Sequence, residues 1–281
     1  MRIMKAKRRL WLMVAMMLSV FFVSCSDEKE EPKEEPKEDP NQPVVGENFD
    51  IFQDLTCDEM VFVKGGTFTM GATEEQIPEA PDDDEYPAHE VTVGDFYIGK
   101  YEVTQELWEY VMGYNPSFPQ LAKYPVESVS LMDCVDFVAN LNSLTGKHFD
   151  IPTEAEWEYA ARGGNMSKGY IYSGSNIIDD VAWYTDNSSQ INHQCGTKAP
   201  NELGIYDMSG NVSEWCSDWY DENYYASSPS LNPTGPKTGL GVVCRGGNHI
   251  YRKQSCRVSS RYFVNANARY GNYGFRLVCR K

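Results

Sequence analysis

The sequence predicts an α+β fold in which a few helices and short strands are joined by long stretches of ordered coil. Three segments begin with residues that cap helix N-termini and continue with apolar residues at helical spacing. Other apolar segments are short and bounded by turn residues, which favours strands. The connections at residues 165–210 and 217–240 are rich in Asn, Gly, Ser and Pro. Loops of this length usually carry function or are ordered by a cross-link or an ion.

Two predicted helices come first in the folded region. The first begins after Thr104, a residue suited to cap a helix N-terminus, and ends before Gly113. The second begins after Ser130, has Asp133 three residues later, and should end at Gly146. Its apolar stripe has i, i+3, i+4, i+7 spacing and comprises Cys134, Phe137, Val138 and Leu141.

The third predicted helix follows Pro152. Thr153 and Glu156 form a capping box, in which each side chain bonds an otherwise unpaired backbone N–H near the helix start. Trp157 then faces the core, and Gly163 should end the helix. The predicted strands are residues 61–64, 90–98, 241–247 and 274–279.

Residues 1–25 are predicted to be a lipoprotein signal peptide. A basic start precedes a fifteen-residue apolar segment, which is short for a membrane-spanning helix and typical of an export signal. The segment ends in a sequence that resembles a lipobox, so we expect Cys25 to be lipidated and to anchor the protein in a membrane. An ordinary signal peptide that carries a cysteine is the alternative.

Residues 26–50 are acidic and rich in proline, and they have too little apolar surface to fold. We therefore expect a disordered tether. Serine and acids directly after Cys25 resemble the surface-export signal of Bacteroidetes lipoproteins. This resemblance implies an outer-membrane lipoprotein at the cell surface, with the periplasmic face as the alternative.

The charge balance argues against a nucleic-acid partner. Removing the five basic residues of the signal leaves 20 basic and 41 acidic residues, a net charge of −21. Nucleic-acid binding needs a basic surface, and a bare anionic membrane would repel this chain. Calcium or cationic ligands fit better, although high net charge also serves solubility alone.

Residues 51–281 are enough for one domain with a sizeable core. Seven cysteines follow Cys25: Cys57, Cys134, Cys195, Cys216, Cys244, Cys256 and Cys279. Disulfides are expected in an exported protein, and the odd number leaves at least one thiol free or paired outside the chain. Spacing does not determine the connectivity, and our preferred pair is Cys216 with Cys244.

A series of motifs runs through the predicted domain, at residues 62–71, 89–93, 101–104, 151–162, 204–215, 244–248, 257–261 and 274–276. In this order they resemble the formylglycine-generating enzyme family, also called the sulfatase-modifying factor family. The resemblance extends from about Met60 to Cys279. It implies that residues 51–281 form the formylglycine-generating-enzyme variant of the C-type lectin fold. That fold has a small twisted antiparallel sheet, few helices and much ordered coil.

The motif at residues 204–215 has the composition of a calcium site. It combines two carboxylates with a glycine-containing loop whose carbonyls can add oxygen ligands. A tight turn whose acids face water is the alternative. The resemblance implies a structural calcium ion bound by the side chains of Asp207 and Glu214 and the main-chain oxygens of Gly210 and Val212.

The resemblance also locates a candidate catalytic site. The enzymes of the family hold copper(I) between two thiolates and oxidise a cysteine of sulfatases to formylglycine. The matching positions here are Tyr251 and Cys256, and Asn248 replaces the active-site serine. Cys256 is therefore the one catalytic candidate, and copper is expected only if catalysis survives. A single thiolate is a poor copper(I) site, and Cys256 is more simply interpreted as a disulfide partner.

Three functions remain open, so the sequence leaves undecided whether the protein is an enzyme. The first is a non-catalytic binding or assembly lipoprotein. The second is a copper-dependent formylglycine-generating oxidase. The third is a diversified ligand-binding protein, because retroelement-diversified receptors use this scaffold and vary its C-terminal segment. Tyr and Asn suit adaptable contacts with a protein or glycan ligand. The candidate contact residues are Asn248, Tyr251, Asn267 and Tyr270.

Overall fold

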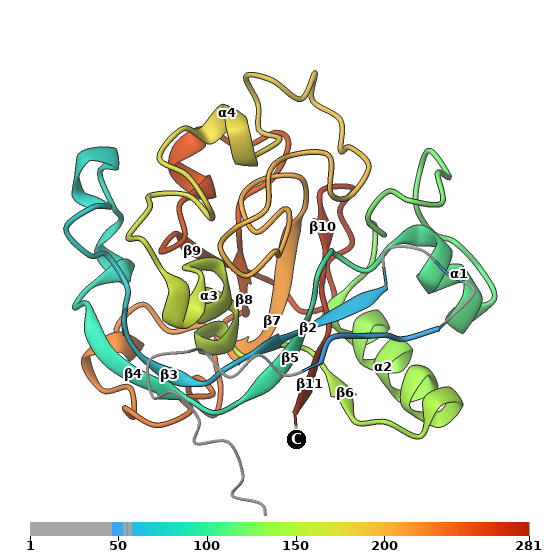
Figure 1. The fold of residues 1–281 in the computed structure, drawn as a ribbon, viewed down its shortest axis with the longest axis horizontal. Helices are drawn as coiled ribbons and strands as arrows, with labels where there is room; N and C mark the ends of the chain where they lie inside the picture. Colours follow the sequence, from blue (N-terminus) through green and yellow to red (C-terminus); the bar gives the residue numbers. More distant parts are fainter. Residues whose placement is uncertain (1–46, 53–54, 56–57, 281) are drawn as a thin grey trace, which may run out of the picture. The chain divides into compact units, whose positions relative to one another are not determined.

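The computed structural model describes residues 47–280 except 53, 54, 56 and 57. The predicted signal peptide, Cys25, Cys57 and most of the predicted tether lie outside the described residues. In the described part, strands and helices are joined by long coil segments (Figure 1). None of its helices is both long and apolar enough to cross a lipid bilayer.

The largest sheet in the described part is antiparallel and has the strand order β1-β2-β5-β11-β6. Its strands are β1 (Phe49–Asp50), β2 (Glu59–Val63), β5 (Phe96–Gly99), β11 (Val278–Arg280) and β6 (Phe149–Asp150). The C-terminal strand β11 therefore lies between β5 and β6 (Figure 1). Strand β1 corrects the predicted domain boundary, because two residues assigned to the tether pair with β2.

A second sheet has the order β10-β7-β8-β9, and a separate hairpin pairs β3 with β4. These strands are β10 (Tyr273–Gly274), β7 (Ser213–Trp219), β8 (Val242–Arg245), β9 (Arg261–Val264), β3 (Gly66–Met70) and β4 (His89–Val93). The β7–β10 pair is parallel, and the other pairs are antiparallel. The described residues thus form three small sheets instead of the single one expected.

The three predicted helices are confirmed: α1 (Gln105–Met112), α2 (Leu131–Thr145) and α3 (Glu154–Ala161). Thr104, Ser130 and Thr153 cap their N-termini, and the latter two form capping boxes. A short helix α4 (Ile178–Val181) and 3-10 turns lie in the connections. The turns are Ile77–Glu79, Asp83–Glu85, Gly164–Met166, Tyr224–Ala226 and Lys253–Cys256. Helices α1 and α2 pack together, whereas α3 lies against β7 and β8 (Figure 1).

The strand predictions were correct in place but not in extent. Predicted strand 90–98 is two strands, β4 and β5, with a turn at Gly94, whose N–H donates to Asn232 Oδ1 at 2.9 Å. Predicted strand 274–279 likewise divides into β10 and β11. Strand β7 was missed, because its acidic and small residues favour a loop until their partners from other elements are known.

The second sheet separates two apolar clusters. Trp215 and Cys244 pair across β7 and β8 and belong to one cluster, with Trp108 of α1. Cys216 belongs to the other cluster, with Trp157 of α3. Because neighbouring residues of a strand point to opposite faces, Cys216 cannot meet Cys244. The predicted disulfide is therefore wrong.

Other described cysteines are also free thiols, so that the free thiols include Cys134, Cys216, Cys244, Cys256 and Cys279. The proposed disulfide of Cys256 is thus wrong as well. Within the described residues, apolar packing and buried ion pairs hold the long connections in place without cross-links.

Candidate functional site

The calcium candidate is a loop that leads into β7. Asp207 and Asn211 both adopt the left-handed conformation, with φ of 58°, which is uncommon outside glycine. Gly210 has φ of 82°, and a Cβ atom there would lie 2.3 Å from the carbonyl oxygen of Trp183. Only glycine fits at that point. The N–H of Gly210 donates to Gly246 O at 2.8 Å, which fixes the loop against the end of β8.

Glu214 is fully buried on β7 and already has strong partners. Arg276 donates to both of its carboxylate oxygens at 2.6 Å, and Trp157 Nε1 donates to Oε2 at 2.7 Å. A carboxylate has about four lone-pair positions, so one position is left on Oε1. Arg276 also donates to the carbonyl oxygens of Gly99 and Tyr206. This ion pair connects β7 with β5, α3 and the calcium candidate loop.

Asp207 is the least satisfied carboxylate in the loop. Its Oδ2 accepts a hydrogen bond from Gly196 N at 2.7 Å. Its Oδ1 is buried and has no hydrogen-bond partner among the described residues. Burial raises the pKa of Asp207 to about 6, and the charge of Glu214 acts in the same direction. The negative charge of ionised Asp207 is therefore not fully balanced by nearby positive charges and hydrogen-bond donors.

Glu102 is a third carboxylate at this site, and the sequence did not reveal it. It accepts hydrogen bonds from Asn211 Nδ2 at 2.8 Å and Val212 N at 3.2 Å. Burial, then the charges of Asp207 and Glu214, raise its pKa well above the ordinary value. The one available signal was an acid between a strand and a helix cap in the motif at residues 101–104.

These side chains form the carboxylate cluster: Glu102, Asp207, Glu214 and Arg276. Three carboxylates and one guanidinium carry a formal charge of −2 when all are ionised. No group of three or more His, Cys, Asp or Glu side chains in the described part is arranged to hold a metal ion. The implied calcium ligands, however, include only two side chains, and their hard oxygen atoms and the unpartnered Asp207 Oδ1 suit calcium. The donor chemistry therefore fits that ion.

The surroundings of Cys256 do not resemble a two-thiolate site. Its thiol is fully buried in an apolar cluster with Tyr172 and Tyr184. Burial raises its pKa to about 12, so the thiol is protonated at neutral pH. Tyr251, the residue that the sequence resemblance matches to the family's other thiolate, has a hydroxyl that hydrogen-bonds to that of Tyr273 at 3.0 Å.

The four candidate contact residues lie in different environments. Asn248 is fully buried, and its Nδ2 donates to Ser213 Oγ at 2.7 Å. It is an interior residue, so its assignment as a candidate ligand contact is corrected. Tyr251 is half-buried. Asn267 and Tyr270 are exposed in the loop between β9 and β10.

A neighbouring loop adds aromatic side chains that the sequence did not single out. Phe118 is 90% exposed and Tyr114 is 49% exposed. The loop lies beside Tyr270 because Phe118 N donates to Glu127 Oε1 at 2.6 Å and Ser128 N donates to Tyr270 O at 3.1 Å. We define the aromatic face as Tyr114, Phe118, Asn267 and Tyr270.

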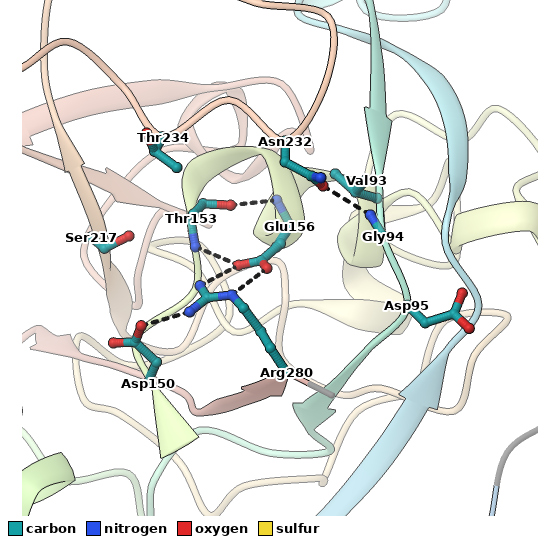
Figure 2. Close-up of a pocket in the computed structure, with 10 residues that line it drawn as sticks. All are labelled: Val93, Gly94, Asp95, Asp150, Thr153, Glu156, Ser217, Asn232, Thr234 and Arg280. Atoms are coloured by element: carbon teal, nitrogen blue, oxygen red, sulfur yellow. Dashed lines mark hydrogen bonds and ion pairs between the residues drawn. The ribbon is translucent and has the colours of Figure 1, made fainter. Parts of the chain in front are cut away.

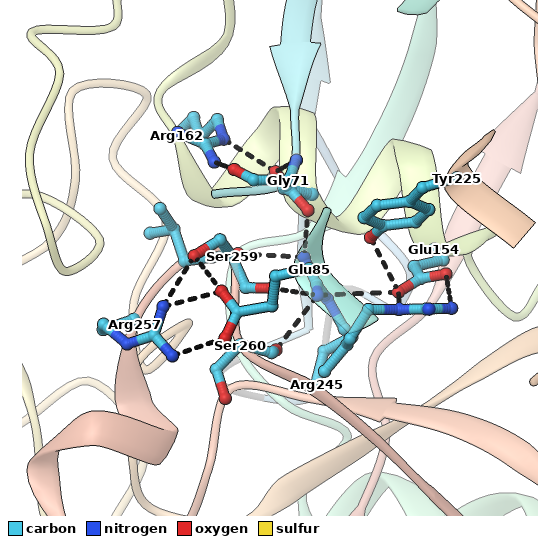
Figure 3. A network of polar contacts seen from close by, with 12 residues as sticks. Gly71, Glu85, Glu154, Arg162, Tyr225, Arg245, Arg257, Ser259 and Ser260 are labelled. Carbon is cyan, nitrogen blue, oxygen red and sulfur yellow. Dashed lines mark hydrogen bonds and ion pairs between the residues drawn. The ribbon is translucent and has the colours of Figure 1, made fainter. Parts of the chain in front are cut away.

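A second buried set of charges lies around α3 (Figure 3). We define the arginine cluster as Glu85, Glu154, Glu158, Arg162, Arg245, Arg257 and Arg261. Arg261 donates to both oxygens of Glu154 at 2.7 and 3.0 Å. Arg245 pairs with Glu158 and donates to the carbonyl oxygen of Ser259 at 2.8 Å. The described contacts of this cluster are internal, so its role is structural.

Burial alone would raise the pKa of Glu85 and of Glu154. The hydrogen bonds and charge of Arg257 outweigh that effect at Glu85, and Arg261 and Arg245 do so at Glu154. The net pKa of each carboxyl group is lowered. Both groups are therefore ionised in the fold at neutral pH.

A cavity of about 500 Å³ lies between the β4–β5 turn, the start of α3 and the end of β11 (Figure 2). Arg280 is its one lining guanidinium, and it donates to both oxygens of Glu156 at 2.8 Å and to Asp150 at 2.6 Å. Figure 2 shows these three side chains directed at one another. Because the guanidinium is already neutralised, this cavity is not suited to an anion.

The fold and the motif-bearing loop identify the family. The chain belongs to the sulfatase-modifying factor enzyme 1-like domain family, whose model matches residues 44–281. It is 31% identical over 275 residues to the chaperone protein LppX of Paenibacillus barcinonensis, covering 80% of this chain and 90% of that protein. It is 34% identical over 187 residues to the formylglycine-generating enzyme of Streptomyces coelicolor, covering 61% of this chain and 57% of the enzyme.

Solved structures agree with this assignment. Treponema denticola variable protein 1 superimposes with a TM-score of 0.74 at 28% identity, covering 85% of this chain and all of that chain. PvdO from Pseudomonas aeruginosa has a TM-score of 0.71 at 27% identity, with the same coverage. The predicted fold class, an α+β formylglycine-generating-enzyme variant of the C-type lectin fold, is confirmed.

Proposed function

We propose that this protein is a binding or assembly lipoprotein that uses a formylglycine-generating-enzyme-like domain without oxidase chemistry. The observation that carries the proposal is the pair of positions 251 and 256. One holds a tyrosine whose hydroxyl bonds Tyr273, and the other holds a buried, protonated thiol. Copper(I) prefers thiolates, and a buried thiol without a second sulfur ligand supplies none.

Copper(I) titration of the purified mature protein tests this proposal. We expect no binding at submicromolar copper(I) and no aldehyde formation in a Cys-x-Pro-x-Arg peptide. The Streptomyces coelicolor formylglycine-generating enzyme, assayed in parallel, is the positive control. Tight copper binding together with peptide oxidation would support the alternative, a copper-dependent oxidase.

We also propose a structural calcium ion at the carboxylate cluster. Asp207 and Glu214 would hold it through their side chains, and Gly210 and Val212 through their main-chain oxygens. When bound, the ion would supply positive charge to a cluster whose formal charge is −2. Support comes from the unpartnered Asp207 Oδ1 and from its raised pKa. Calcium would stabilise a loop that contains two left-handed non-glycine residues.

The aromatic face, with the neighbouring Tyr251, is the proposed contact surface for a protein or glycan ligand. Its aromatic groups offer contact area at small entropic cost. The similarity to a variable protein and to a chaperone is consistent with a binding role. A photo-crosslinking residue placed at Phe118 or Tyr270 on intact cells should yield a discrete adduct. The same residue at Leu144, which is 59% exposed on α2, should not.

Membrane attachment through Cys25, at the cell surface, is the remaining part of the proposal. It rests on the sequence of residues 1–50 and on no structural observation. Labelling with a palmitate analogue should mark the wild-type protein and not the Cys25→Ser variant. Protease treatment of intact cells then tests whether the domain faces outward. The acidic composition supports a partner other than nucleic acid.

A further inference from the structure

A groove of about 580 Å³ lies beside β9, and its lining includes no residue of the aromatic face or of the carboxylate cluster. Its walls come from the segment after β7, from the segment before β8 and from one side chain of β9. The residues used below are Tyr220, Asp221, Glu222, Leu240 and Phe263. We call this feature the acidic groove.

The apolar part of the acidic groove is pre-formed. Phe263 is 45% exposed and stacks on Tyr220, with ring centroids 4.5 Å apart and an interplanar angle of 27°. The hydroxyl of Tyr220 donates to Asp84 Oδ2 at 2.6 Å, and the guanidinium of Arg261 lies 4.8 Å from its ring centroid. Tyr220 is thus held from several sides. Leu240, 90% exposed, adds an apolar rim.

The charged part of the acidic groove is negative. Asp221 Oδ1 accepts a hydrogen bond from Asn223 N at 2.7 Å, and Glu222 Oε1 accepts a weak one from Asn223 Nδ2 at 3.4 Å. Neither carboxylate forms an ion pair within the described part of the chain. The nearby cation, Arg261, is already paired with both oxygens of Glu154. Two carboxylates beside an exposed aromatic ring therefore remain without a counter-charge.

We propose that the acidic groove binds an arginine-containing basic segment of a protein partner. A guanidinium is planar and weakly hydrated, so it stacks on an aromatic ring while its N–H groups donate to carboxylates. Phe263 supplies the ring, and Asp221 and Glu222 supply the acceptors. The net charge of −16 for the whole chain adds long-range attraction for a basic partner. This site is separate from the aromatic face, so it does not depend on the proposed function.

Fluorescence anisotropy with a labelled Gly-Arg-Gly-Arg-Gly peptide tests the proposal on the mature protein. We expect saturable binding that weakens with salt, and about tenfold weaker binding by the double variant Asp221→Asn and Glu222→Gln. The matched control removes two exposed acids elsewhere, Glu109→Gln and Asp136→Asn, and should bind like the wild type. Thermal melts of both double variants verify that each remains folded.

A second peptide tests whether binding depends on the positive charge of the arginine side chains or only on their size and shape. Replacing each arginine by citrulline keeps the size and removes the positive charge, so binding should fall about tenfold. Phe263→Leu should weaken the arginine peptide, whereas Phe118→Ala should leave its binding unchanged. Equal binding of the two peptides, equal losses in both double variants, or no binding at millimolar peptide would each overturn the proposal. Binding of a neutral oligosaccharide instead of the arginine peptide would also overturn it.

Discussion

The arginine cluster and the carboxylate cluster are both buried, but their charges are balanced differently. In the arginine cluster each of the three carboxylates has at least one guanidinium partner. In the carboxylate cluster three carboxylates share Arg276. The pKa of Glu154 is accordingly lowered, whereas those of Glu102 and Asp207 are raised, and burial opposes ionisation in every case.

The difference shows that burial alone does not decide whether an interior carboxylate is ionised. The number of nearby cations decides it, because desolvation acts on both clusters in the same direction. The arginine cluster is complete with protein atoms alone. The carboxylate cluster lacks about two positive charges, which is what a divalent cation would supply.

The largest expected effect is the loss of an arginine from the complete cluster. Arg245→Met should lower the free energy of unfolding by about 3–5 kcal/mol, because Glu154 and Glu158 would each lose a buried guanidinium partner. Urea unfolding at neutral pH measures the change. A loss below about 1 kcal/mol would mean that the pair contributes no more than an exposed ion pair.

The next effect concerns Asp207, whose ionised carboxylate destabilises the fold without calcium and is offset when calcium binds. Its folded pKa of about 6 lies above the unfolded value, so its ionisation destabilises the calcium-free fold as pH rises from about 4 to 6. At pH 7 with a chelator, Asp207→Asn should therefore be more stable than wild type by roughly 3 kcal/mol. Urea unfolding in the presence of EDTA measures this difference.

Calcium should then stabilise only the wild type. A concentration one hundred times the dissociation constant adds about 2.7 kcal/mol to the free energy of unfolding. The same titration on Asp207→Asn is the control, since that variant lacks one proposed ligand. Equal stabilisation of both proteins, or of neither, would contradict the proposed calcium site.

Another pH-dependent effect is expected at Asp218, which lies beside the arginine cluster without an ion-pair partner among the described residues. Burial and the charge of Glu154 raise its pKa to about 8. Because the folded state then holds a proton that the unfolded state releases above about pH 4, this group makes stability fall as pH rises from 4 to 8. The slope is at most about 1.4 kcal/mol per pH unit.

Asp218→Asn should remove that slope, since an amide does not titrate but can still accept the hydrogen bond from Glu154 N at 3.0 Å. Unfolding curves of both proteins at several pH values measure the difference. Parallel pH profiles would show that the carboxyl group of Asp218 is ionised in the folded protein. Its negative charge would then be balanced, like those of the carboxylates in the arginine cluster.

The smallest effect is expected for an exposed ion pair. Lys253 lies 2.7 Å from Glu79, but its side chain is 42% exposed. Lys253→Met should change the free energy of unfolding by less than about 0.5 kcal/mol. Measured beside Arg245→Met, it tests whether burial makes the difference between the two pairs. A loss as large as that of Arg245→Met would remove the basis for the comparison.

Local features of the chain were predicted with good accuracy. The caps at Thr104, Ser130 and Thr153 and the helix ends at Gly113 and Gly146 were all correct. Each depends on side chains that bond a backbone N–H within three residues, or on a glycine in the left-handed conformation. Such interactions are visible in a window of a few residues, so no tertiary information is needed.

Features that depend on distant partners were not predicted. Strand β7 was interpreted as loop because the partners that stabilise Glu214 and Trp215 lie 62 and 86 positions away in the sequence. The Cys216–Cys244 pair was wrong because spacing does not show which face of a strand a side chain occupies. Asn248 was a candidate contact residue, although it is buried and its partner is Ser213, 35 positions away.

The sequence by itself determined the three longer α-helices of the described part and the family. Only the tertiary structure decided which carboxylates are compensated and which are not. Arg257 reaches Glu85 across 172 positions, and Arg276 reaches Glu214 across 62. The energy of a buried charge depends on the distance to its counter-charge in space, and sequence separation carries no measure of that distance.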